Sequence, residues 1–214
     1  MTINRSINRA IAGLIILLSS FFFSPVRAHS FNVIVITPMG EIIPRSMLNG
    51  FLLATREQDG HEDETSDGHL GGLDSHVLEI DSSAGNKDSI NQLKNLISTS
   101  SPLFAVGLDL SESVHKMLQE YEVVVVDPVR NGLWGSVVNY EEQIMIFDGT
   151  LFSAAFMRDY RHLPDETAHQ AYISARAIAS IIRNSDEEMR DNPVELRRAA
   201  KSLIENPGRL KLIR

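Results

Sequence analysis

The loop Gly107–Ser113 (Gly-Leu-Asp-Leu-Ser-Glu-Ser) has the residue types best suited to binding a small ligand. It follows a short apolar run and precedes a segment of helical periodicity, so Ser111 is expected at a helix N-terminus. Free backbone N–H groups and the positive end of the helix dipole favour a carboxylate there, within reach of Asp109, Ser111 and Ser113. The alternative is capping, because Ser111 or Asp109 would satisfy the same N–H groups without a ligand.

A second candidate site lies in Asp127–Gly135, directly after four consecutive valines. Proline and glycine in this stretch are typical of a turn. Arg130, Asn131 and the single tryptophan, Trp134, could line a ligand cleft beside the Ser111 loop. The same residues could instead form a chain reversal that Trp134 packs, and the sequence leaves both interpretations open.

Histidines and carboxylates gather in His61–His69, with His76 nearby, and such side chains can hold a divalent metal. Their spacing matches neither a zinc motif nor a calcium loop. We therefore expect an exposed, solvated acidic loop over Gly60–Ser75, with no metal and no cofactor.

Nucleophilic catalysis has little support in the sequence. The chain has no cysteine, no Gly-x-Ser-x-Gly elbow and no Gly-x-x-x-x-Gly-Lys phosphate loop. The remaining histidines (His115, His162 and His169) have no sequence partner that suggests a triad. We expect a protein that is not an enzyme and has no catalytic residues; a small hydrolase is a minor alternative.

The elements that must position these residues alternate along the first half of the chain. Apolar, β-rich runs predict strands over residues 31–37, 76–82, 103–107 and 122–127. Apolar residues at helical spacing predict helices over 42–59, 88–98 and 111–121. This alternation predicts an α/β fold: an open parallel sheet of Rossmann-like type, with strand order 2-1-3-4 and helices on both faces. The run Val123–Val126 is typical of a central parallel strand that is covered on both faces.

The pattern changes after Pro128. Glu142–Asp148 is a candidate fifth strand, and two helices then dominate. Asp165 is expected to cap the first of them, and Asn192, followed by Pro193 and Glu195, the second.

The first 28 residues have the order of a secretory signal peptide: arginines, then an apolar run from Ala10 to Phe23, then a small-residue site ending at Ala28. We expect cleavage there and one periplasmic domain over residues 29–214; an uncleaved membrane anchor is the alternative. Removing three arginines and no acid changes the formal charge from −8 to about −11. That charge argues against nucleic acid as a partner.

Several stretches resemble the periplasmic leucine-binding family of branched-chain amino acid ABC transporters. They are Met47–Glu57 with its Gly50-x-x-x-Ala54-x-x-Glu57 pattern, the glycine-rich Gly68–Ile80, Phe104–Ser111, and a C-terminal set (Phe156, Tyr160-Arg161, Leu163-Pro164-Asp165, Ala171-Tyr172 and Ala175-Arg176). The resemblance implies a type I periplasmic-binding fold and a ligand held by a serine and a threonine. Ser111 matches the serine; Arg130 or Asn131 stands where the threonine is expected.

The chain departs from that family in length, because only residues 128–143 separate the fourth strand from the returning part. The resemblance thus implies a single lobe, made of residues 29–128 and 144–206, without the second lobe. It implies a non-enzymatic solute-binding-like protein related to amino-acid transport, with an amino acid or small carboxylate as ligand. The alternative is an accessory subunit that has lost solute binding and docks a periplasmic protein, a membrane transporter or a second copy through residues 128–143.

Overall fold

The computed structural model describes residues 30–38, 45–57, 66–82, 87–131, 150–186, 190 and 192–205. The strands are β1 (Ser30–Pro38), β2 (His69–Leu70), β3 (Leu73–Ser82), β4 (Phe104–Gly107) and β5 (Val124–Val126). The helices are α2 (Ser46–Arg56), α3 (Lys87–Ser100), α4 (Glu112–Glu120), α6 (Phe152–Tyr160), α7 (Glu166–Arg183) and α9 (Pro193–Glu205). None of these helices is long and apolar enough to cross a membrane. The expected signal peptide and fifth strand lie outside the described residues.

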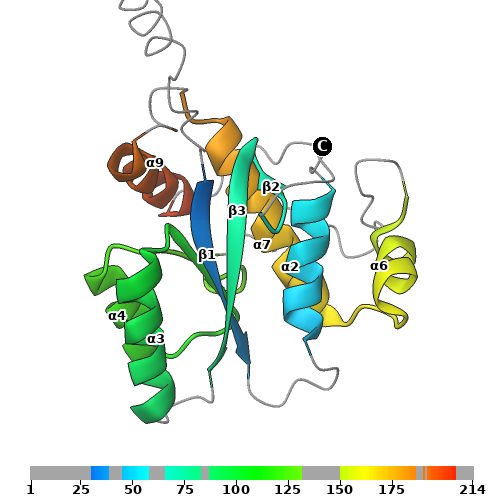
Figure 1. The fold of residues 1–214 in the computed structure, drawn as a ribbon, viewed down its shortest axis with the longest axis horizontal. Helices are drawn as coiled ribbons and strands as arrows, with labels where there is room; N and C mark the ends of the chain where they lie inside the picture. Colours follow the sequence, from blue (N-terminus) through cyan, green and yellow to red (C-terminus); the bar gives the residue numbers. More distant parts are fainter. Residues whose placement is uncertain are drawn as a thin grey trace, which may run out of the picture.

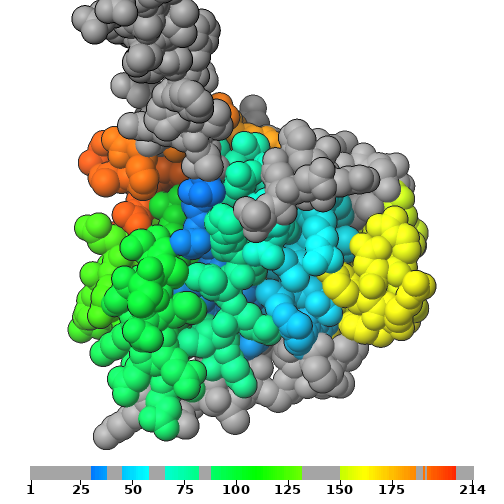
Figure 2. Space-filling model, in the orientation of Figure 1, coloured from blue at the N-terminus to red at the C-terminus, as the bar shows by residue number. Residues whose placement is uncertain are grey.

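The strands form one sheet in the order β2-β3-β1-β4-β5, in which β3, β1, β4 and β5 are parallel. This confirms the predicted α/β class and the order 2-1-3-4 of the four predicted strands. Helices α3 and α4 lie on one side of the sheet and α2, α6 and α7 on the other (Figure 1). The space-filling view shows the same division, with α3 and α4 far from α6 (Figure 2).

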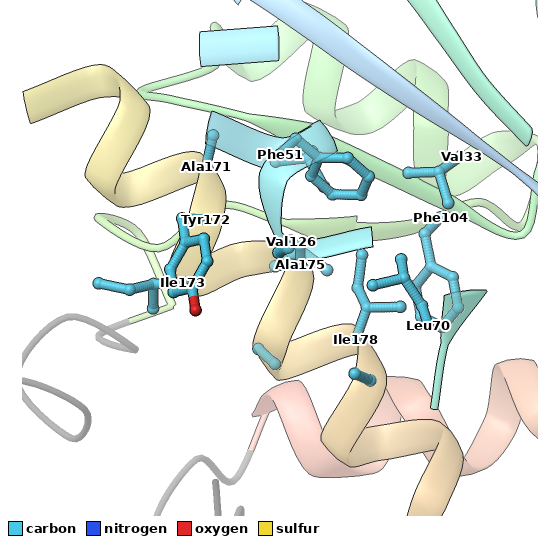
Figure 3. Packing of buried hydrophobic residues seen from close by; sticks show 14 of the residues in the cluster. Val33, Phe51, Leu70, Phe104, Val126, Ala171, Tyr172, Ile173, Ala175 and Ile178 are labelled. Atoms are coloured by element: carbon cyan, nitrogen blue, oxygen red, sulfur yellow. The ribbon is translucent and has the colours of Figure 1, made fainter. Parts of the chain in front are cut away.

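Successive side chains along each strand point to opposite faces of the sheet, which explains why both faces are covered by helices. In β1, Val33 and Val35 belong to the larger core cluster with α2, α6, α7 and α9, whereas Ile34 and Ile36 belong to the cluster with α3 and α4. Successive strand side chains point to opposite faces, so an unbroken apolar run must be covered twice. Figure 3 shows the larger cluster, in which Phe51 of α2 lies on the side of Val33 and Phe104 of the sheet. Tyr172 of α7 packs its ring on Phe152 of α6, with the ring centroids 4.6 Å apart.

The valines around β5 show the same double coverage. Val124 and Val126 face the larger cluster, and Val123 and Val125 face the other. Within the described residues β5 is the last strand of the sheet, beyond β4. The predicted burial on both faces is confirmed, since α4 and α9 pack against this strand. The candidate strand Glu142–Asp148, which would bear on its central position, lies outside the described residues.

The prediction of an exposed loop over Gly60–Ser75 is wrong for residues 69–75, nearly half of that range. Residues 69–75 form the β2–β3 hairpin, in which Leu70 and Ser75 are fully buried. Gly71 and Gly72 make its two-residue turn with φ angles of 67° and 91°. Positive φ at both central residues is the type I′ geometry that glycine favours, and the turn adds an antiparallel strand to a sheet predicted to be parallel.

The second half of the chain has three helices in the described residues, not the predicted two, because α6 was missed. Asp165 caps α7 as predicted, accepting a hydrogen bond from the Ala168 N–H. Asn192 caps α9 as predicted, accepting from the Val194 N–H. The same oxygen of Asp165 also accepts from the Ser46 hydroxyl at 2.6 Å, so this carboxylate joins the first turns of α2 and α7.

This shared cap predicts a pH-dependent stability. Burial raises the pKa of the Asp165 carboxyl, but hydrogen bonds from Ser46, Ala168 and Thr167 outweigh it and hold the pKa below its usual 3.8. A carboxylate with a lowered folded pKa stabilises the fold above its unfolded pKa, and that stability is lost as pH falls through the folded pKa.

We therefore expect Asp165→Asn to lower the free energy of unfolding by about 1 kcal/mol at pH 7, because the amide keeps the acceptor oxygen but loses its charge. The difference in the free energy of unfolding between this variant and the parent should shrink as the pH is lowered towards 3. Urea unfolding at a series of pH values measures it, with the exposed Asp186→Asn as the control for one lost negative charge. A constant difference across that range would contradict the prediction.

Candidate functional site

The predicted site residues lie where two adjacent parallel strands end. The loop Gly107–Ser111 follows β4, and the turn Asp127–Asn131 follows β5. The chain runs from β1 to β3 on one side and then crosses to β4 on the other, so the edge between β1 and β4 is the topological switch point. Ligands of open α/β sheets bind outside the carboxyl ends of the strands at such a point.

A buried carboxylate, Asp127, holds the two loops together. One of its oxygens accepts from the Val129 and Arg130 N–H groups at 3.1 and 3.0 Å, and the other accepts from the Leu110 N–H at 3.2 Å. The side chain is fully buried. Sequence reasoning missed this residue, although an aspartate before proline at the end of a strand is a usual turn-forming residue.

Ser111 is the N-cap of α4, and its hydroxyl accepts from the Val114 N–H at 3.4 Å. It also lies 3.1 Å from the Ser113 hydroxyl, and both serines are exposed. Ser111 therefore caps α4, as the capping alternative expected of Ser111 or Asp109, and Asp109 is not the cap. Capping uses one lone pair of the hydroxyl, so its hydrogen can be donated either to the Ser113 hydroxyl or to a ligand.

Arg130 reaches the start of α4. Its guanidinium donates to the Glu112 carboxylate at 2.7 Å, and both side chains are exposed, Glu112 by 82%. Exposed ion pairs of this kind contribute little stability. A ligand carboxylate could therefore replace Glu112 at small cost. Asn131 turns inward instead, because its side-chain oxygen accepts from the Asp127 N–H at 2.8 Å.

The structure thus brings Asp109, Ser111, Ser113 and Arg130 to one exposed edge and gives Asn131 a role within its turn. Asp109 is exposed with a φ of 50°, a left-handed conformation that aspartate tolerates better than most residues. Trp134 lies outside the described residues. So does most of His61–His69; His69 itself pairs with Asp74 at 2.8 Å. Within the described residues no three metal-ligating side chains gather.

A scan against known protein families gives no match for this chain, and searches of curated proteins and of solved structures give none either.

Proposed function

We propose that this protein is an exported, non-enzymatic binding module, built as a single solute-binding lobe, whose ligand is an amino acid or another small carboxylate. The observation that supports it is the meeting of the Arg130 guanidinium with the N-terminus of α4, at the carboxyl ends of β4 and β5 and one strand from the switch point of the sheet. There the ligand carboxylate accepts from the Arg130 guanidinium and the Ser111 and Ser113 hydroxyls, in place of Glu112.

Binding at this edge is weak. All the contacting groups lie on one exposed face, whereas a typical small-molecule pocket covers roughly 70% or more of its ligand. The Glu112 carboxylate also competes with the ligand for Arg130, since the two side chains are already paired.

The test is a titration of the isotope-labelled protein with leucine and with acetate, followed by backbone NMR. We expect shift changes confined to Gly107–Ser113 and Arg130–Asn131. Ser111→Ala and Arg130→Gln should each weaken binding by roughly tenfold, because each removes one charge-assisted hydrogen bond. Glu112→Gln should act in the opposite direction and tighten binding, because it removes the internal competitor.

Ser98→Ala is the control, since the Ser98 hydroxyl is an exposed donor on α3 that bonds the Lys94 carbonyl. The Ser98→Ala variant should bind leucine and acetate with the same affinity as the parent. If neither ligand shifts these residues, or if Glu112→Gln weakens binding, the solute-binding proposal is wrong. Val129, 53% exposed beside Arg130, would then favour the docking alternative.

A further inference from the structure

A cavity of about 420 Å³ lies beside β5, and Asn131, from the turn after β5, is among its lining residues. Helix α4 packs against β5, and α9 packs against β5 and α7, so the cavity opens between the two helices. Its volume falls within the roughly 300–1,000 Å³ of known ligand sites. Its apolar lining comes from Val123, Val124, Val125, Val194 and Ile204.

Two buried nitrogen atoms in the cavity lining have no hydrogen-bond partner. They are Nε of Arg197, on α9, and Nε2 of His115, on α4. Within the described residues no ion pair holds the Arg197 guanidinium. The Nε–H of arginine can only donate, so a buried, unpaired one calls for an acceptor oxygen.

Arg190 also has a buried Nε without a partner, but it does not line the cavity, so Arg197 is the cavity arginine to compare with the paired arginines. Arg45, Arg130, Arg158 and Arg198 each pair with a carboxylate. The chain carries 28 acidic residues against 20 basic ones, so carboxylate partners are plentiful. An unpaired guanidinium next to a cavity in so acidic a protein is suited to an anion from outside the chain.

The remaining charges of the cavity lie at its rim. Lys201 adds a second cation, and Arg198 is held by Glu195 at 2.6 Å. Glu122 and Glu205 also line the cavity, and both are exposed. Arg197 is half-buried, and it is the cavity cation with a buried nitrogen that has no partner, because the carboxylates at the rim do not pair with it.

We propose that this cavity binds a small organic anion, with its carboxylate on Arg197 and its apolar body against the valines of β5. His115 donates a second hydrogen bond to the carboxylate from Nε2, in the tautomer that carries its hydrogen there. Asp109, Ser111, Ser113 and Arg130 do not line this cavity, although Asn131 does, and the proposal does not depend on the proposed solute-binding function.

The test uses hexanoate, hexylamine and acetate as probes of the full chain by backbone NMR and calorimetry. Hexanoate should shift Val123–Val125 and the residues of α9. Hexylamine, with the same apolar body and the opposite charge, should not bind there, and acetate should bind more weakly than hexanoate because it lacks the apolar body.

Arg197→Met keeps an apolar stem and removes the charge, and it should weaken hexanoate binding roughly tenfold to a hundredfold. Lys116→Gln removes one positive charge from an exposed residue next to His115 that does not line the cavity, and should leave binding unchanged. Ser111→Ala should also leave it unchanged, which separates this site from the Ser111 edge.

Helix α9 must remain folded in the Arg197→Met variant. Retained dispersion of the NMR signals of α9 checks this. If that dispersion is lost, hexanoate binding to Lys201→Gln decides instead, and a weakening of severalfold is expected. Equal binding of hexanoate and hexylamine, or equal affinity of Arg197→Met and Lys116→Gln, would overturn the proposal.

Discussion

We expect Gly50→Ala to lower the free energy of unfolding by about 3 kcal/mol, at the upper end of the cost of overpacking. Gly50 lies where α2 crosses α7, and a Cβ built on it would stand 2.1 Å from the Ala168 carbonyl oxygen. Real Cβ atoms do not approach a backbone atom so closely, so the two helices would have to move apart. They carry much of the larger core, including Phe51 and Tyr172 (Figure 3).

Helix propensity alone predicts that Gly50→Ala raises the free energy of unfolding. Alanine is favoured over glycine inside a helix by about 1 kcal/mol. The steric cost exceeds this gain, because the obstacle is backbone and cannot rotate away. Asn49→Ala, on the same helix and only partly buried, is the matched control, where the propensity gain should appear without the clash.

Urea unfolding monitored by circular dichroism measures both variants. A Gly50→Ala protein as stable as the parent would mean that α2 and α7 do not cross as closely as described.

The second large effect is expected at Asp127, which ties the loop after β4 to the turn after β5. Asp127→Ala removes the acceptor for three backbone N–H groups, those of Leu110, Val129 and Arg130. An unsatisfied buried donor costs about 1–3 kcal/mol, and water can reach the exposed Val129 and Arg130 more easily than the buried Leu110. We expect a total loss of about 3 kcal/mol in the free energy of unfolding.

Asp127→Asn distinguishes the contributions that the two side-chain oxygens make to stability. The amide oxygen can keep the bonds from Val129 and Arg130, whereas the amide nitrogen would face the Leu110 N–H, donor against donor. We expect a loss of about 1–2 kcal/mol, between the parent and the alanine variant. Asp109→Asn, an exposed carboxylate in the same loop, is the control and should change stability little.

Denaturant unfolding ranks the three variants. An Asp127→Ala protein no less stable than Asp109→Asn would show that the carboxylate does not hold the loops together. In the folded fraction, the NMR signals of Leu110–Ser113 should shift most, since their attachment to the second loop is lost.

Local patterns in the sequence sufficed to predict the helices and the parallel strands of the first half of the chain. The run Phe31–Thr37 is apolar on both faces, which only a parallel strand covered twice explains. Asp165 and Asn192 could be recognised as caps because their partners lie two or three residues further along the chain. Helix α6 escaped prediction because it is short, nine residues, and its apolar residues Phe152, Ala155 and Phe156 give only one turn of pattern.

The candidate site at the strand ends was predictable in part. Parallel strands place their carboxyl ends at one edge, so Ser111 and Arg130 were expected near each other. Residue types do not give the distance between the Ser111 hydroxyl and the Val114 N–H. Only that distance shows that the hydroxyl caps α4. The Arg130–Glu112 pair joins residues from two different loops, and no local pattern marks it.

The sequence by itself determined the fold class, the order of the parallel strands and the two helix caps, because each depends on periodicity or on hydrogen bonds between near neighbours. Only the tertiary structure decided the rest. The burial of Asp127, the contact of Gly50 with Ala168 and the cavity shared by His115 and Arg197 all join residues distant in the chain. Such juxtapositions follow from how helices pack on a twisted sheet, and a difference of one turn in that packing would place other side chains together.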